Sequence, residues 1–381
     1  MKRIIVILIS LLFLTGCWDL GETEQVGFAT FIGIDIADNN QIKLMIQDMS
    51  PPTGVSGKQS GDTSGNTAVE SHEATAQTMS EAINQINTTN DEVTDLSHTY
   101  VIALSEEFVE KKGISPVIDF FERTPAIRRN VLLLIAKKGK LNDLCNPDAL
   151  STSNSNSGKS IMEIIRNKQD CSIISAITLG EFLNMTWETG EDAYTAGVSS
   201  INKSTEKTDL FDISIGDTAV FKGEKFSGWL DNEETIGLLL AKGKIKGGTI
   251  SVNIQGENIS LNITRVKSKF KPELNGDKMK VLIDINVESK LAESQTRQSF
   301  IDLNIINNVN DALQKKIQTQ VISTFERTQA LDTDVFGFGN YFFGEYPEYW
   351  RQIEANNVDY YRDVTIELNV ETKIRYLGLI K

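Results

Sequence analysis

Residues 99–136, TYVIALSEEFVEKKGISPVIDFFERTPAIRRNVLLLIA, decide which fold the chain adopts. The first and last segments, Thr99–Leu104 and Val131–Ala136, are largely apolar runs of the kind found in buried strands. The residues between them predict two short helices. The second helix opens at Ser115 and Pro116, because proline fits the first turn of a helix. Strand, helices and strand in this order predict a mixed sheet with helices packed on it.

The segments on the N-terminal side extend this sheet. Gln25–Ile36 and Gln41–Asp48 show alternation along their length, which predicts two strands joined by a turn. The composition of residues 50–66, SPPTGVSGKQSGDTSGN, predicts a flexible loop, since large apolar side chains are nearly absent. Glu73–Asn87 then predicts a helix, because apolar residues recur there at helical spacing.

Beyond about residue 202 the pattern changes to long alternating strands, predicted at Ile250–Ile254, Ile259–Lys269 and Lys278–Glu288. An amphipathic helix over Ser299–Arg327 and a closing strand over Val364–Arg375 follow them. The sequence therefore predicts an α+β protein whose three-domain body has mixed and antiparallel sheets packed by helices. The expected division is a cleaved lipoprotein signal peptide at 1–16, an N-terminal α+β domain at 17–202, a small middle domain at 203–248 and a C-terminal α+β domain with the long helix at 249–381.

The first 22 residues, MKRIIVILISLLFLTGCWDLGE, have the layout of an export signal. Lys2 and Arg3 precede an apolar core of about 11 residues, which is too short to span a bilayer. Leu14–Cys17 fits the bacterial lipobox, in which the cysteine thiol is acylated and becomes the new N-terminus. The sequence thus predicts a lipoprotein that a diacylglyceryl group on Cys17 holds at a membrane, since two acyl chains suffice for stable anchoring. An ordinary secretory signal that ends near a cysteine is the alternative.

The composition of the 381-residue chain is acidic, with a formal net charge of −14. An acidic body is repelled by phosphate backbones and by anionic lipid head groups, so nucleic acid is not expected as a partner. The lipid, and not a basic face, would hold the protein at the membrane. Besides Cys17 the chain has Cys145 and Cys171. Outside the cell these two could form a disulfide, and their spacing permits this without requiring it.

No stretch of the sequence carries a convincing catalytic or cofactor motif. Ser157–Ser160 contains the GKS end of a phosphate loop, but Ser153 stands where the first glycine is required. Gly337-Phe338-Gly339 begins like a dinucleotide fingerprint, but its third glycine comes two positions late, and an aromatic-rich turn packed into a core is the plainer prediction. With only two histidines in the chain, the usual triads and zinc sites are not expected. The sequence predicts no enzyme activity, no cofactor and no metal site, although carboxylates distant in sequence could still form an active site.

The residues after the lipobox resemble the start of a known family. Cys17-Trp18-Asp19 with Glu22 forms a C-W-D-x-x-E start, and Gly33-Ile34-Asp35 follows shortly. Together with short motifs later in the sequence, this start resembles the Ger(x)C family, the lipoprotein C subunits of germinant receptors in spore-forming bacteria. The later pieces are His98 before its apolar strand, Phe121-x-Arg123, Arg128-Arg129, the segment Asp334–Gly339 with Gly337 and Gly339, and Gly378 near the end.

The resemblance implies a three-domain α+β body of unusual fold, lipidated at Cys17 and placed on the outer face of the spore inner membrane. It also implies that the protein acts together with two integral membrane subunits, A and B, in triggering germination by nutrients such as amino acids or sugars. It supplies no catalytic residue and does not place a nutrient site on this chain. The Ser/Gly-rich loop at 50–66 departs from the family pattern. The alternative functions are a solute-binding lipoprotein, with a ligand in a cleft between domains, and a tethered enzyme.

Overall fold

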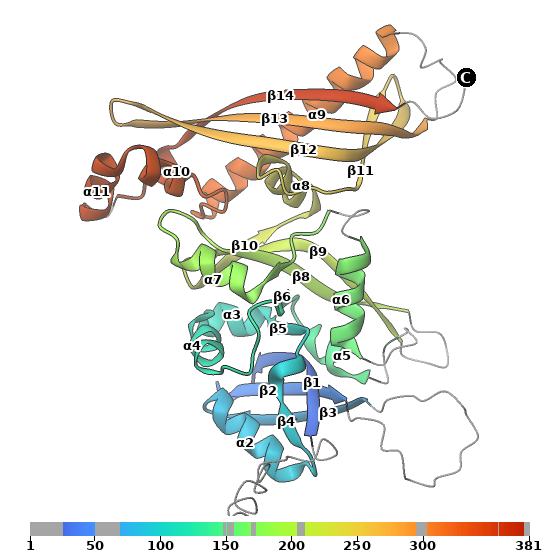
Figure 1. Cartoon of the computed structure of the whole chain (residues 1–381), viewed down its shortest axis with the longest axis vertical. Coiled ribbons are helices and arrows are strands. Elements are labelled where there is room, and N and C mark those ends of the chain that lie inside the picture. Colours follow the sequence, from blue (N-terminus) through green and yellow to red (C-terminus); the bar gives the residue numbers. More distant parts are fainter. Residues whose placement is uncertain are drawn as a thin grey trace, which may run out of the picture.

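The computed structural model describes residues 26–49, 69–147, 150, 156–168, 173–203, 210–294, 303–356 and 358–376. The export signal, the C-W-D-x-x-E start, the loop at 50–66 and Cys171 lie outside these described residues. Two sheets follow one another along the long axis of the molecule, and helices pack against both (Figure 1). Among the described residues, no helix is both long enough and apolar enough to cross a membrane.

The large sheet has the strand order β10-β9-β8-β6-β5-β1-β2-β3, with the short strands β4 and β7 beside β1 and β6. Its centre is parallel, because β1, β5, β6 and β8 run in the same direction, whereas the outer strands are antiparallel. The mixed sheet predicted from residues 99–136 is thus confirmed. The strands are β1 Val26–Ile36, β2 Ile42–Met49, β3 Val69–Ala76, β4 Val93–Asp95, β5 Val101–Ser105, β6 Leu132–Ala136, β7 Ile177–Thr178, β8 Tyr194–Asn202, β9 Phe211–Lys222 and β10 Lys225–Leu230.

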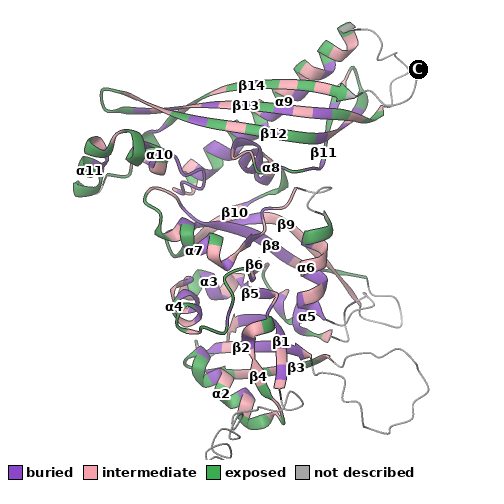
Figure 2. Cartoon of the chain, viewed as in Figure 1, coloured by how far each residue is buried: buried purple, intermediate pink, exposed green. Residues whose placement is uncertain are grey.

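Helices cover both faces of the large sheet, which explains the apolar runs in its central strands. In β5, Ile102 and Leu104 pack in the same cluster as α3 and α4, whereas Val101 and Ala103 pack in the cluster that holds α5 and α6. Figure 2 shows buried residues along these strands. The elements are α2 Met79–Thr89, the 3-10 turn η2 Leu96–His98, α3 Glu106–Lys112, α4 Ser115–Arg123, α5 Leu141–Cys145, α6 Ser157–Lys168 and α7 Leu179–Trp187.

The helix predicted over Glu73–Asn87 is wrong in its first part. Residues Val69–Ala76 form β3, which pairs antiparallel with β2 as far as Ala76 and Ile42. The backbone groups of this segment are satisfied by the neighbouring strand, a partner that local spacing cannot reveal. The helix begins only at Met79, where the side chain of Thr78 accepts a hydrogen bond from the backbone N–H of Glu81.

The small sheet has the order β11-β12-β13-β14, and only the last pair is parallel. Helix α9 lies against it as predicted, because apolar residues four positions apart form one face. Val309, Leu313, Ile317 and Val321 on this face are each 0% exposed. The elements are β11 Thr249–Ile254, β12 Glu257–Asn275, β13 Lys278–Ser294, α9 Leu303–Ala330, α10 Phe338–Glu345, α11 Pro347–Ala355, the 3-10 turn η4 Tyr361–Asp363 and β14 Thr365–Tyr376.

Helix α8 (Asn232–Ala241) connects the two sheets. It packs closely on α9, since a Cβ added to Gly237 would lie 2.2 Å from Oγ1 of Thr324. Strands β9 and β10 fall within the expected middle domain at 203–248, yet they pair with the large sheet, whose hydrogen bonding continues past residue 202. The division into three domains stays a prediction, because strand pairing alone does not define a domain.

Candidate functional site

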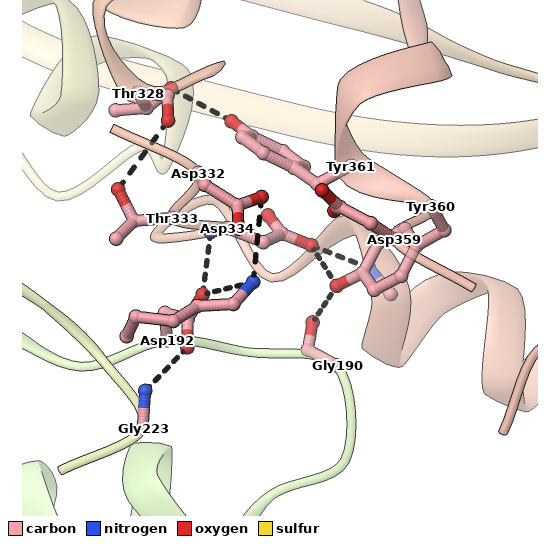
Figure 3. A network of polar contacts seen from close by, with 12 residues as sticks. Gly190, Asp192, Gly223, Thr328, Asp332, Thr333, Asp334, Asp359, Tyr360 and Tyr361 are labelled. Atoms are coloured by element: carbon pink, nitrogen blue, oxygen red, sulfur yellow. Dashed lines mark hydrogen bonds and ion pairs between the residues drawn. The ribbon is translucent and has the colours of Figure 1, made fainter. Parts of the chain in front are cut away.

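A buried group of polar side chains lies where the two sheets meet (Figure 3). We call it the Asp334 network. Its residue from the large sheet comes just before β8, and the other four lie at the end of α9, before α10 and before β14. The network therefore joins segments of both sheets. Its members are Asp192, Thr328, Asp334, Tyr360 and Tyr361.

The carboxylate of Asp334 binds the first turn of α10. Its Oδ1 accepts hydrogen bonds from the backbone N–H groups of Gly337 at 2.9 Å and Phe338 at 3.0 Å, and its Oδ2 accepts one from Gly339 at 2.8 Å. A helix leaves its first N–H groups without partners, and negative charge is favourable at that end. Gly337 has a φ of 76°, a left-handed conformation that lets the chain turn back towards the carboxylate.

Two neighbouring tyrosines fasten the start of β14 to the same region. The hydroxyl of Tyr360 donates a further hydrogen bond to Oδ2 of Asp334 at 2.8 Å. The hydroxyl of Tyr361 lies 2.8 Å from Oγ1 of Thr328 on α9. The Nε2 of Gln329, the next residue of α9, donates to the carbonyl of Tyr361 at 2.9 Å. These bonds fix the segment before β14 against the end of α9.

Asp192 brings the large sheet into the network. Its backbone N–H donates to the carbonyl of Asp334 at 2.9 Å, and the backbone N–H of Asp334 donates to Oδ2 of Asp192 at 2.8 Å. The other carboxylate oxygen of Asp192 accepts from the backbone N–H of Gly223, between β9 and β10, at 3.0 Å. A single carboxylate thus holds two loops of the large sheet to the turn between α9 and α10.

Two glycines allow the backbone of the loop before β8 to touch the backbone of α10. A Cβ on Gly190 would lie 2.4 Å from the carbonyl carbon of Gly339. A Cβ on Gly339 would lie 2.3 Å from the hydroxyl oxygen of Tyr360 and 2.6 Å from Cα of Gly190. The backbone N–H of Asn340 also donates to the carbonyl of Gly190 at 3.1 Å. Any side chain at either glycine would push the loop before β8 away from α10.

Burial sets the protonation behaviour of the network. It raises the pKa of Asp334 to about 6, while the hydrogen bonds from Gly339, Phe338 and Tyr360 act in the opposite direction. Burial and the nearby charge of Asp334 raise the pKa of Tyr360 well above its ordinary value, so its hydroxyl keeps its proton and stays a donor. All four donors around Asp334 are inside the protein, an arrangement that holds segments together and presents no nucleophile to a substrate.

Lys242 ties α8 to the same junction. Its Nζ donates to Oε1 of Glu191 at 2.7 Å and to the carbonyls of Val335 at 2.9 Å and Phe336 at 3.2 Å. These three bonds use all three protons of the ammonium group. The Lys242 side chain is only 10% exposed, so the charge is paired inside the protein and not offered to solvent.

Replacing Lys242 by methionine is expected to lower the free energy of unfolding by about 2 kcal/mol. Methionine keeps the apolar stem, but it leaves the carboxylate of Glu191 and two carbonyls without their donor. Chemical denaturation of the full chain measures the loss. Lys246→Met is the matched control on an exposed residue, and a change of about 0.5 kcal/mol or less is expected there. Equal effects of the two substitutions would contradict the assigned role of Lys242.

A cleft of about 480 Å³ opens beside this junction, between the connection that follows α8, strand β12 and helix α10. Lys244, Ser268, Phe270 and Tyr341 are among its lining residues. The Oγ of Ser268 is buried, and it has no hydrogen-bond partner among the residues that the structure describes. Within those same residues, no group of three or more His, Cys, Asp and Glu is placed to hold a metal ion. The cleft presents a hydroxyl, a cation and aromatic rings, which are groups suited to binding a ligand.

Two family models match the chain, the spore germination protein N-terminal domain over residues 19–200 and the spore germination B3/GerAC-like C-terminal domain over residues 216–378. The chain belongs to the Ger(x)C family of spore germination proteins. Spore germination protein KC of Bacillus subtilis (strain 168) is 23% identical, with 98% of this chain and 95% of that protein covered. Spore germination protein A3 of the same organism is 25% identical, with 99% and 98% covered. The crystal structure of the GerBC protein matches with a TM-score of 0.57 at 19% identity, over 90% of this chain and 96% of that one, which confirms the α+β fold.

The residues that carried the Ger(x)C resemblance do not form one site. Gly337 and Gly339 belong to the turn around Asp334, whereas Gly33 and Asp35 lie in β1 of the large sheet. A Cβ on Gly33 would lie 2.8 Å from Sγ of Cys145, so this glycine leaves room for the cysteine. The thiol of Cys145 is buried, and burial raises its pKa. Its pairing with Cys171 stays a prediction, because that residue lies outside the described part of the chain.

The other Ger(x)C motif residues lie on the surface or outside the described chain. Arg123 pairs with Asp119 at 2.8 Å, and exposed Arg129 lies 5.7 Å from the ring centroid of Trp187. Exposed His98 has its Nδ1 2.9 Å from Oγ of Ser97, while Arg128 is also exposed. Functional roles for these residues stay predictions. The same holds for Cys17, Trp18, Asp19 and Glu22, which lie outside the described residues.

The sequence did not point to most of the junction in this Ger(x)C protein. Asp192, Tyr360 and Lys242 belong to no motif, and each contacts residues far away in the chain. One local signal was present. Asp334 stands a few residues before the predicted turn with its glycines, and aspartate is a preferred capping residue at the start of a helix.

Proposed function

We propose that the chain is the lipid-anchored, non-enzymatic C subunit of a nutrient germinant receptor. In this role it sits on the outer surface of the spore inner membrane, beside the integral membrane A and B subunits, and is needed for triggering germination. The observation that carries the proposal is the match of both spore germination family models, which together run from residue 19 to residue 378. The lipobox at Leu14–Cys17 supports the membrane location.

The junction between the sheets supports action through protein contacts. Its buried acids are bound by backbone N–H groups, a tyrosine hydroxyl and a lysine, so they are engaged in holding the fold. A catalytic carboxylate needs access to a substrate proton. Asp334 is 1% exposed and has no such access.

Cys17→Ala is expected to abolish lipid labelling, because the acylated thiol is removed. Growth with a radiolabelled fatty acid, followed by purification of the tagged full chain, measures the label. Cys145→Ala is the matched control, since this cysteine is buried in the fold, and its labelling should be unchanged. Spores with Cys17→Ala should also germinate more weakly, since the protein is no longer held at the membrane. Normal labelling of that variant would refute the anchor.

Purification of the tagged protein from spore inner membranes tests the partners. Two integral membrane proteins of the receptor should come with the wild-type chain and be depleted with Cys17→Ala. Recovery of the chain alone under mild detergent conditions would count against a receptor subunit. Calorimetry of the full chain with amino acid or sugar germinants tests the solute-binding alternative. Saturable heat without the membrane subunits would favour that alternative.

A further inference from the structure

Strand β12 has one edge that is paired along only part of its length. On one side, β12 pairs with β13 from Ile259 to Asn275. On the other side, its pairing with β11 runs only from Glu257 to Asn262, and the backbone N–H of Ile263 makes a last bond to the carbonyl of Gly248 at 2.8 Å. Among the residues that the structure describes, no strand pairs with β12 on that side beyond this point. We call residues 264–275 the free edge.

The free edge lies beside α10 over Lys269–Glu273, where residues of both line one hollow. A Cβ on Gly243 would lie 3.1 Å from the backbone nitrogen of Ser268, so the α8–β11 connection lies against the edge at this residue. The hydroxyl of Ser268, which has no hydrogen-bond partner in the described part of the chain, lines the cleft there. Pro272, which has no N–H, also lies in this part of β12, and proline is tolerated in a strand where no neighbour needs its donor.

A groove runs between the free edge and helix α10. It consists of the cleft of about 480 Å³ and a second hollow of about 560 Å³. Phe270, Asn340 and Tyr341 line both hollows, so the two lie next to each other. The ring of Phe270 packs edge-on against Phe338 at 5.2 Å and Tyr341 at 5.3 Å, so the floor is aromatic. In Figure 1, α10 lies beside the part of β12 that extends beyond β11. A strand edge beside a helix is a common receptor for an extended peptide.

A basic row follows the outer side of the free edge. Arg265, Lys267, Lys269 and Lys271 alternate along β12 and are all exposed, in a protein whose net charge is −14. Lys271 is paired with Glu273 at 3.3 Å. Within the described part of the chain, Lys267 and Lys269 have no ion-pair partner. Residues directly opposite on paired strands have Cβ atoms about 5 Å apart, so acidic side chains on an added strand would reach these lysines.

We propose that the free edge of β12 binds an extended acidic segment of a partner protein as an added strand. In such a segment, alternate acidic side chains lie beside Lys267 and Lys269, and the apolar side chains between them contact Phe270 and Tyr341. The groove along Lys269–Glu273 holds about five residues at roughly 3.3 Å each. The site goes beyond the proposed function, since it assigns a binding surface that does not depend on the lipid anchor.

The charge pattern argues against a second copy of this chain as the occupant. Pairing two free edges would bring the two rows of Arg265, Lys267, Lys269 and Lys271 against each other. Like charges directly opposite one another on paired strands are destabilising. Lysines on an edge strand commonly prevent such self-association. The same lysines leave the edge open to a strand of opposite charge.

Fluorescence anisotropy with the full chain in detergent tests the proposal. The probe is a labelled nine-residue peptide of alternating glutamate and valine. It should bind saturably, and the same peptide with lysine in place of glutamate should bind at least tenfold more weakly. Two further probes carry N-methyl groups on alternate amides, one set for each edge of the peptide. Only one of them should lose binding, because an added strand uses a single edge.

Two variants of the chain test where on its surface the peptide binds. Lys269→Glu should weaken binding about tenfold or more, whereas Lys290→Glu should not change it. The second variant makes the same charge change on exposed Lys290 in β13, which has strands on both sides. Absence of saturable binding, equal effects of the two N-methyl patterns, or insensitivity to Lys269→Glu would each overturn the proposal. If the unlabelled chain forms dimers and thereby displaces the labelled peptide, the free edge binds a second copy, and the proposal is also overturned.

Discussion

Asp334→Ala is expected to lower the free energy of unfolding by about 4 kcal/mol or more at neutral pH. The substitution leaves the backbone N–H groups of Gly337, Phe338 and Gly339 and the hydroxyl of Tyr360 without their acceptor. Each buried donor that loses its partner costs about 1–3 kcal/mol. Denaturant unfolding of the full chain measures the change. Asp363→Ala removes an exposed carboxylate nearby and should cost about 0.5 kcal/mol or less.

The same carboxylate should make stability depend on pH. Burial raises the pKa of Asp334 to about 6 from an ordinary value of 3.8, so between these values the folded protein holds a proton that the unfolded chain has lost. Stability from this group is therefore fully present below about pH 4 and is lost as the pH rises through about 6, by up to roughly 3 kcal/mol. The advantage of the wild type over Asp334→Ala should shrink across this range. An advantage that grows with pH would contradict the raised pKa.

Gly339→Ala is expected to lower the free energy of unfolding by about 3 kcal/mol, because the added methyl group has no room. It would lie 2.3 Å from the hydroxyl oxygen of Tyr360, which is bonded to Asp334, and 2.6 Å from Cα of Gly190 in the loop before β8. Overpacking of this kind typically costs about 1–3 kcal/mol and sometimes more. Thermal and denaturant unfolding both measure the effect.

A glycine in the same helix provides the matched control. Gly344 also lies in α10, and nothing stands within 4 Å of a Cβ placed there. Alanine favours helix over glycine by about 0.5–1 kcal/mol, so Gly344→Ala should be neutral or stabilising. The two substitutions are thus expected to have opposite signs. A stabilising Gly339→Ala would mean that the backbones of α10 and of the loop before β8 do not touch at this point.

The local pattern of apolar residues predicted those strands and helices whose buried faces follow from periodicity. The apolar runs at 99–104 and 131–136 became buried strands, and the apolar residues four apart became the inner face of α9. The strand at 69–76 was missed because its last residue, Ala76, lies three positions before Met79 and so also fits helical spacing. Its true partner is the edge of β2, and edge strands with polar side chains leave little trace in local sequence.

The junction between the sheets was less accessible to prediction than the fold. The turn at Gly337-Phe338-Gly339 was expected to pack aromatic residues, and Phe336, Phe338, Phe342 and Trp350 are indeed buried. Tyr341 is 45% exposed instead and forms part of the groove. The bond between Asp334 and Asp192 joins residues 142 positions apart. One sequence holds no sign of such a pair, because neither residue belongs to a periodic pattern that constrains the other.

The double link between Asp192 and Asp334 has a mechanical consequence. Tilting one sheet against the other would have to break the two hydrogen bonds between Asp192 and Asp334 and the contact of Gly190 with Gly339 at the same time. The described body should therefore transmit displacement as one rigid piece. Force applied to β1 in the large sheet would reach α10 and the free edge of β12 without being absorbed by a hinge between the sheets.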